Sequence, residues 1–178
     1  MKFRRHFLLS GLLAFSLTGV NVPAQDAVLR VGTDATFSPM EFVENDKRTG
    51  FDIELLEAMA KAIGKRVEWV DIDFKGLIPG LVAKRFDVAV SAIYITDERK
   101  KVVDFTDSNF AGGLIAMTKD GNSAIKTLAD LDGKKVTVQV GIKSVSYLQQ
   151  NHPKVQLVEV EKIRRCSTSS RLVAPTRL

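Results

Sequence analysis

The sequence predicts an α/β fold built around a parallel sheet, and two observations carry that prediction. Residues 28–31, 67–72 and 87–93 form short apolar stretches rich in β-branched side chains, which is typical of strands in a parallel sheet. Helical patterns separate these stretches, with one apolar stripe over 52–63 and another over 77–82. Strands that alternate with helices fold into a parallel sheet covered by helices, so this is the expected class.

Residues 1–24 have the pattern of a secretory signal peptide. Three basic residues lie within 2–5, an apolar core covers 7–20, and the chain then reaches a small-x-small pattern that ends at Ala24. The apolar core is too short to make a good membrane span. We therefore expect cleavage after Ala24 and a periplasmic product, exported either by the general secretory route or by the twin-arginine route.

The net charge of +5 does not indicate a nucleic-acid or membrane partner. Of the 26 basic residues, three lie in the leader and four in 164–178, and neither segment holds an acid. The segment between them carries 19 basic residues against 21 acidic ones, so it is nearly neutral. The sequence shows no Gly-rich phosphate loop and no Cys/His set with zinc spacing, so no cofactor or metal is expected. The single cysteine, Cys166, leaves no partner for an intrachain disulfide.

The apolar stretch 87–93 leads into a helix start that has the chemistry of an anion site. Thr96 can cap the helix with its hydroxyl, and Asp97 and Glu98 follow in the first turn, where the helix dipole favours acids. Arg99 lies in the same turn, where the dipole disfavours a cation. A carboxylate held between the guanidinium and the free helix amides would account for this arginine. A solvated arginine on a charged helix face would account for it equally well.

Four stretches carry motifs that occur in a fixed order along the chain. They are VGTDATFSPMEF at 31–42, GFDIELL at 50–56, LIPGL with RFD within 77–87, and SAIYITDER followed by VDFTD within 91–107. Together they resemble the family-3 bacterial solute-binding proteins, the periplasmic amino-acid-binding components of ABC importers. The resemblance covers about 28–161 and implies a periplasmic-binding-protein-like fold of two lobes with the ligand between them.

The resemblance also implies the domain boundaries. Lobe one is expected at 25–117 and nearly complete, with the first of two hinge strands at 110–117. Lobe two is expected at 118–162 and only partial. Residues 163–178 do not resemble the family, and their lack of an apolar period and of acids suits a disordered tail.

The ligand contacts follow from the resemblance, residue by residue. The core motif of the family corresponds here to SAIYITDER at 91–99, and we call the strand expected at 87–93 the signature strand. The family holds the ligand carboxylate with the arginine of this motif and with amides at the start of a lobe-two helix. It holds the amino group near the end of the signature strand. Its side-chain pocket is built in the loop after the first strand. On this sequence, these roles fall on Arg99, Gly141, Ile142 and Lys143 for the carboxylate, Ser91, Ala92 and Tyr94 for the signature strand end, and Asp34 and Phe37 for the side-chain pocket.

Some of these positions depart from the family or allow a structural explanation. Ile142 lacks the hydroxyl that relatives place there, so only its amide transfers, and we expect Ser144 to cap the helix that starts here. Asp34 could instead form an Asx-type turn, and Phe37 could fill the core. Tyr94 replaces a small Ser or Thr of many relatives, which leaves the identity of the amino acid open.

The resemblance implies a non-enzymatic monomer that binds an amino acid and delivers it to ABC permease subunits in the inner membrane. An alternative is a periplasmic dehydratase acting on cyclohexadienyl acids, since a few relatives are such enzymes. That alternative needs a general acid in the cleft, and Glu41 or Asp34 would supply it. A sensor domain of a signalling receptor fits less well, because no membrane span follows in the sequence.

A shifted reading frame would explain why the family pattern ends after Lys162. Back-translated with G or C at third codon positions and read from the third base of the Ile163 codon, the tail can encode PEVLDVVAAGRADAA. That string predicts an amphipathic helix and a turn into a strand, which is what the resemblance implies at this point. We predict that the nucleotide sequence continues in this frame past the Lys162 codon. A gene in which no family-like frame follows that codon would contradict the hypothesis.

Overall fold

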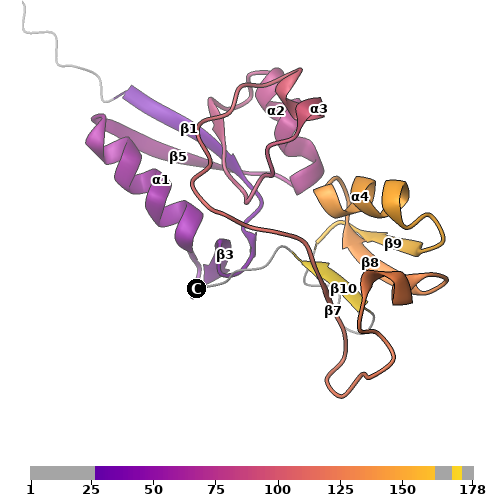
Figure 1. Cartoon of the computed structure of the whole chain (residues 1–178). Helices are drawn as coiled ribbons and strands as arrows, with labels where there is room; N and C mark the ends of the chain where they lie inside the picture. Colours follow the sequence, from indigo (N-terminus) through magenta and orange to yellow (C-terminus); the bar gives the residue numbers. More distant parts are fainter. Residues whose placement is uncertain (1–26, 163–169, 174–178) are drawn as a thin grey trace, which may run out of the picture.

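The computed structural model describes residues 27–162 and 170–173. The expected signal peptide, Cys166 and the tail residues 163–169 and 174–178 lie outside these residues, so those expectations stay predictions. The described chain forms two lobes that are joined by a long crossing segment (Figure 1). This arrangement agrees with the expected two-lobe α/β fold.

Lobe one is built on a three-stranded parallel sheet in the order β5-β1-β6. Strand β1 (Ala27–Thr33) lies in the centre, between β5 (Lys65–Asp71) and the short β6 (Val88–Ala89). Two helices connect the strands, α1 (Phe51–Ala62) and α2 (Leu77–Val82), the latter preceded by the 3-10 turn η1 (Phe74–Gly76). The alternation of strand and helix predicted from the sequence is therefore confirmed.

The signature strand is shorter than predicted. We expected it to cover 87–93, but β6 ends at Ala89. Ala92 has a φ of 45°, and this left-handed conformation turns the chain away from an extended path. The following helix α3 (Asp97–Lys100) begins as predicted, because the Thr96 hydroxyl accepts a hydrogen bond from the Arg99 amide.

A small antiparallel sheet lies beside the end of β1 and contains β2 (Thr36–Phe37), β3 (Glu41–Glu44) and β4 (Lys47–Thr49). The hairpin between β3 and β4 turns at Asn45 and Asp46, which both have positive φ. Asn and Asp tolerate this conformation better than other side chains do, so the sequence fits a tight turn. The sheet holds Glu41 under the signature strand end.

Lobe two has a four-stranded sheet in the order β7-β10-β8-β9, with helix α4 (Lys143–Asn151) and the 3-10 turn η2 (Leu128–Leu131). Its strands are β7 (Ile115–Met117), β8 (Lys135–Gln139), β9 (Gln156–Val160) and β10 (Ser170–Val173). β10 pairs antiparallel with β7 and parallel with β8. The expectation of a disordered tail is therefore wrong for 170–173, because these residues complete the sheet between β7 and β8.

The face of α1 that we expected to be core is largely open. Ala60 is buried, but Met59 and Ile63 are 50% and 64% exposed, and Val82 of α2 is 56% exposed. Among the described residues, Met59 lines an open groove of about 910 Å³ together with residues 103–112. The apolar pattern of the sequence was identified correctly, but the described elements leave that surface uncovered.

Asp52 lies near the start of α1 but does not cap the helix. Gly50 occupies the N-cap position, and Asp52 lies buried in the first turn. Its Oδ2 accepts a hydrogen bond from the Ala92 amide at 2.8 Å. The carboxylate therefore supports the signature strand end instead of the helix start.

The core of lobe one centres on Phe86, which is 1% exposed and lies in the turn before the signature strand. The ring packs closely on Gly32 of β1 and Gly80 of α2. A Cβ atom at either glycine would come within 2.6–2.7 Å of ring atoms. Both positions therefore require the absence of a side chain.

We predict that Gly32→Ala lowers the free energy of unfolding by about 1–3 kcal/mol, because the added methyl group overpacks the Phe86 ring. Chemical denaturation would measure the loss. Combining Gly32→Ala with Phe86→Leu should cost less than the sum of the two single changes. Additive effects would show that the glycine and the ring are not coupled.

Candidate ligand-binding site

The carboxyl ends of the parallel strands of both lobes meet around one cavity. β1 leads into Asp34, β5 into Phe74 and β6 into Ser91, while β8 of lobe two ends at Gln139. Residues at the start of α4 complete the wall. Because open α/β sheets bind ligands beyond the carboxyl ends of their strands, this cavity is the candidate site.

The cavity brings together seven of the nine residues predicted from the sequence: Asp34, Phe37, Ser91, Ala92, Tyr94, Ile142 and Lys143. It offers about 40 Å³ to the centres of water molecules, which is room for about three waters when one needs ~10–15 Å³. A whole amino acid is larger than this. The lobes must move apart, or the wall side chains must shift, before such a ligand can enter.

Arg99 and Gly141, the remaining two predicted residues, contact each other at the edge of the cleft. Arg99 Nη2 donates to the Gly141 carbonyl at 3.0 Å, and Nη1 donates to the Tyr94 carbonyl at 2.7 Å. The guanidinium also lies 5.7 Å from the ring centroid of Phe74, which lines the cavity. Burial lowers the pKa of Arg99, although it remains a cation. Arg99 therefore connects the two lobes at the border of the cavity.

The start of α4 faces the same end of the cavity. Ile142 is the N-cap residue and has no side-chain acceptor, so the first helix amides lack a capping partner. Ser144 was expected to cap the helix, and this prediction is wrong. Its hydroxyl is fully buried in the cavity wall, and within the described residues it has no hydrogen-bond partner. A buried hydroxyl beside free helix amides is suited to an anionic group.

Two buried carboxyl groups, those of Glu41 and Asp52, support the end of the signature strand. Glu41 is 1% exposed, and its Oε1 accepts a hydrogen bond from Ser91 Oγ at 2.9 Å. Burial, followed by the negative charge of Asp52, raises the pKa of Glu41 to about 9. Glu41 Oε2 receives no hydrogen bond in the described structure. When Glu41 carries a proton, its carboxyl group can donate a hydrogen bond to the Asp52 carboxylate. The interaction between these two carboxyl groups then becomes favourable.

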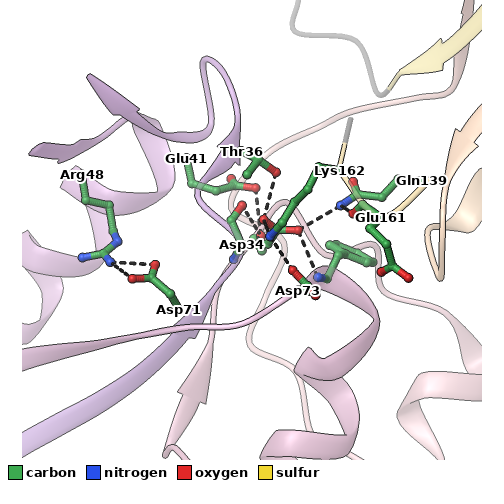
Figure 2. A network of polar contacts seen from close by, with 11 residues as sticks. Asp34, Thr36, Glu41, Arg48, Asp71, Asp73, Gln139, Glu161 and Lys162 are labelled. Atoms are coloured by element: carbon green, nitrogen blue, oxygen red, sulfur yellow. Dashed lines mark hydrogen bonds and ion pairs between the residues drawn. The ribbon is translucent and has the colours of Figure 1, made fainter. Parts of the chain in front are cut away.

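The Asp34 carboxylate lies at the centre of a polar network that joins both lobes (Figure 2). It is 3% exposed. Thr36 Oγ1 and Lys162 Nζ contact its Oδ1, at 2.9 and 3.0 Å. The Phe74 amide and Gln139 Nε2 contact its Oδ2, at 3.0 and 2.9 Å. Asp34 is therefore fully paired within the chain in this arrangement.

Sequence reasoning missed four residues of this region. Phe74, Gln139 and Ser144 lie in the cavity wall, and Lys162 contacts Asp34. Three of them have a signal that could have been used. Phe74, Gln139 and Lys162 each lie at or just after the carboxyl end of a parallel strand, and such positions meet at one sheet edge. The contact of Lys162 with Asp34 had no such signal, because the two residues are 128 positions apart in the chain.

Comparisons with known proteins show which family the chain belongs to. The family described as bacterial extracellular solute-binding proteins, family 3, matches residues 29–171. The chain belongs to this family. A solved structure described as an ancestral arginine-binding protein bound to arginine superimposes with a TM-score of 0.79 at 39% identity, over 83% of this chain and 70% of that one.

Two curated relatives show the same relationship over part of their length. The chain is 39% identical to a probable histidine-binding protein of Campylobacter jejuni over 126 residues, which are 71% of this chain and 47% of that protein. It is 45% identical to the arginine-binding extracellular protein ArtP of Bacillus subtilis over 114 residues, 64% of this chain and 44% of that protein. The chain therefore spans about half the length of these relatives.

The described part of the chain lacks both a membrane-spanning helix and a metal-binding cluster of side chains. Across 27–162 and 170–173, none of the helices has the length and apolar character needed to cross a membrane. In the same residues, His, Cys, Asp and Glu side chains do not gather in a group of three that could hold a metal ion.

We predict that Glu41 makes the protein less stable as the pH rises. The pKa of Glu41 in the folded state is raised from 4.5 to about 9, so the folded state keeps the proton of Glu41 to higher pH than the unfolded state does. The stabilisation that this proton contributes is lost as the pH rises from 4.5 to about 9. The slope contributed by this group is at most about 1.4 kcal/mol per pH unit. Denaturant titrations across this range should show a flatter profile for Glu41→Gln.

Glu44→Gln is the matched control, because Glu44 lies on the same strand and is exposed. It should keep the pH profile of the wild-type protein. Identical profiles for wild type and Glu41→Gln would show that Glu41 is ionised in the folded state throughout this range.

Proposed function

We propose that the protein captures an amino acid between its two lobes and delivers it to the permease of an ABC importer. Membership of the family and the names of its relatives support this assignment. The relatives bind different amino acids by name, so the family alone leaves the ligand side chain open. The proposed location is the periplasm, and the proposed solution state is a monomer.

One observation carries the proposal, namely the anion-binding character of the cleft edge. The Arg99 guanidinium lies beside the start of α4, joined to it by the hydrogen bond to the Gly141 carbonyl. The unpartnered hydroxyl of Ser144 is buried next to the same helix start. A ligand carboxylate would exchange with the Gly141 carbonyl and accept hydrogen bonds from the guanidinium, the helix amides and Ser144.

The rest of the cavity suits the other parts of an amino acid. Phe37, Phe74, Tyr94 and Leu114 form apolar wall that can pack against a side chain. The Tyr94 hydroxyl donates to the Gly113 carbonyl at 2.9 Å, so its ring is held in place at the crossing segment. The signature strand end, at Ser91 and Ala92, offers backbone groups to the ligand amino group.

Contacts between the two lobes explain how binding would close the cleft. Lys75 of lobe one pairs with Glu161 of lobe two at 2.7 Å, and Arg99 and Asp34 also contact lobe two. The segment before β7 crosses between the lobes (Figure 1). Hinge movement about such a crossing would open the cavity for entry and renew these contacts after binding.

The dehydratase alternative has less support. Glu41 has the neutral carboxyl group that a general acid needs, since its pKa is raised to about 9. Glu41 lines the cavity, but its Oε1 already accepts a hydrogen bond from Ser91 Oγ, and its side chain is 1% exposed. This contact assigns Glu41 to holding the signature strand end in place.

We predict that Arg99→Ala weakens amino-acid binding by about 1.5–3 kcal/mol, because it removes a charge-assisted hydrogen bond to the ligand carboxylate. That is roughly a 10- to 150-fold rise in Kd. Titration calorimetry with a panel of free amino acids would measure it. The panel identifies the bound amino acid at the same time.

Arg99→Lys separates charge from geometry. It keeps the cation but cannot form the two parallel hydrogen bonds of a guanidinium, so it should recover only part of the lost affinity. Unchanged affinity in Arg99→Ala would remove Arg99 from the site. Failure of the wild-type protein to bind any free amino acid would contradict the proposed function.

A further inference from the structure

We infer that Lys162 determines which class of amino acid the cleft accepts. Its ammonium group neutralises Asp34 from within the chain, so the cleft favours a ligand with an uncharged side chain over one with a cationic side chain. This inference rests on the proposed function, because it concerns the ligand of the same cavity.

The first step concerns the capacity of Asp34 for further hydrogen bonds. An ionised carboxylate has about four acceptor positions, two on each oxygen. Oδ1 accepts from Thr36 and Lys162, and Oδ2 accepts from Phe74 and Gln139. Every donor is supplied by the chain. A ligand cation would have to displace one of them, and Lys162 is the one that it resembles in charge.

The second step concerns charge. Asp34 is 3% exposed, and a buried carboxylate is costly unless a cation or strong donors compensate it. Lys162 supplies that cation, and it also contacts Asp73, so a single ammonium group lies between two carboxylates (Figure 2). A guanidinium or ammonium group of a ligand at this end of the cavity would lie close to Lys162 and be repelled.

The third step concerns how firmly Lys162 is held. Partial burial alone lowers the pKa of Lys162, but hydrogen bonds to Asp73 and Asp34 outweigh burial and raise that pKa above its ordinary value. The side chain is 35% exposed, and its ammonium group contacts the carboxylates of Asp34 and Asp73. Its neighbour Glu161 is fixed to Lys75 of the opposite lobe, and Gln139 Nε2 donates to the Glu161 carbonyl at 3.0 Å.

The polar group that would meet an uncharged ligand side chain is Gln139. Its side-chain amide lines the cavity and is buried, and its Nε2 is already used by Asp34 and the Glu161 carbonyl. The amide oxygen of Gln139 is the acceptor of this group and suits a neutral donor such as a carboxamide N–H. L-Glutamine is therefore the uncharged probe, and L-arginine is the cationic probe of similar length.

The test compares the two probes on the wild-type chain and on Lys162→Met by titration calorimetry. The wild-type protein should bind L-glutamine at least about tenfold more tightly than L-arginine. Lys162→Met leaves the Asp34 carboxylate without its internal cation. In this variant, the ratio of the affinity for L-arginine to the affinity for L-glutamine should rise at least about tenfold over the wild-type ratio. Wild-type preference for L-arginine, or an unchanged ratio of affinities in Lys162→Met, would overturn the inference.

Three variants make the result specific to the charge at this position. Lys162→Arg keeps a cation beside Asp34 and should keep the wild-type ratio. Lys75→Met removes the other lysine that joins the lobes without touching Asp34, so it should change both affinities together and leave their ratio unchanged. Lys162→Met combined with Asp34→Asn should lose the gained affinity for L-arginine, because the carboxylate is no longer there.

Folding and the proposed function are tested separately. Circular dichroism of each variant reports the fold, and a destabilised Lys162→Met should regain its thermal unfolding midpoint with L-arginine but not with L-glutamine. No such difference would overturn the inference. Binding of neither probe nor any other amino acid by the wild-type chain would overturn the proposed function itself, whereas binding of both with an unaltered ratio overturns only the role of Lys162.

Discussion

The buried carboxylate of Asp34 is the group on which the arrangement of the two lobes depends most. It lies at the end of the central strand of lobe one and accepts hydrogen bonds from Gln139 and Lys162 of lobe two. A charge that is 3% exposed is costly unless it is compensated, and these two side chains supply part of that compensation beside Thr36 and the Phe74 amide. These contacts draw the carboxyl ends of both parallel sheets to one point, and the cavity forms there.

A second pair of acids, Glu41 and Asp52, performs a different task in the same lobe. The Asp52 carboxylate holds the amide of Ala92, whose φ of 45° is unusual for a residue with a side chain. Glu41 accepts a hydrogen bond from the Ser91 hydroxyl, and its burial raises its pKa to about 9. The signature strand end is thus fixed in an unusual conformation by two buried carboxyl groups. Pre-organisation of this kind lowers the cost of ordering the site on binding.

The fold class followed from local signals in the sequence, and seven residues of the cavity wall followed from the resemblance to the family. β-branched runs and apolar helical stripes indicated the parallel sheet, and Thr96 indicated the start of α3. The predicted extent of the signature strand was wrong, because the left-handed conformation of Ala92 depends on the distant carboxylate of Asp52. The predicted cap at Ser144 was wrong for a related reason, since its hydroxyl is buried in the wall of a cleft formed by both lobes.

The sequence by itself determined the order of strands and helices and placed chemically suitable residues at the ends of strands, because hydrogen-bonding patterns and side-chain periodicity act over a few neighbouring residues. Only the tertiary structure decided which of these residues are paired with each other. Asp34 and Lys162 are 128 positions apart, and their contact exists because two separate sheets present their carboxyl ends to the same cavity. Whether two buried charges pair depends on how close they lie in space, and local sequence patterns do not encode that distance.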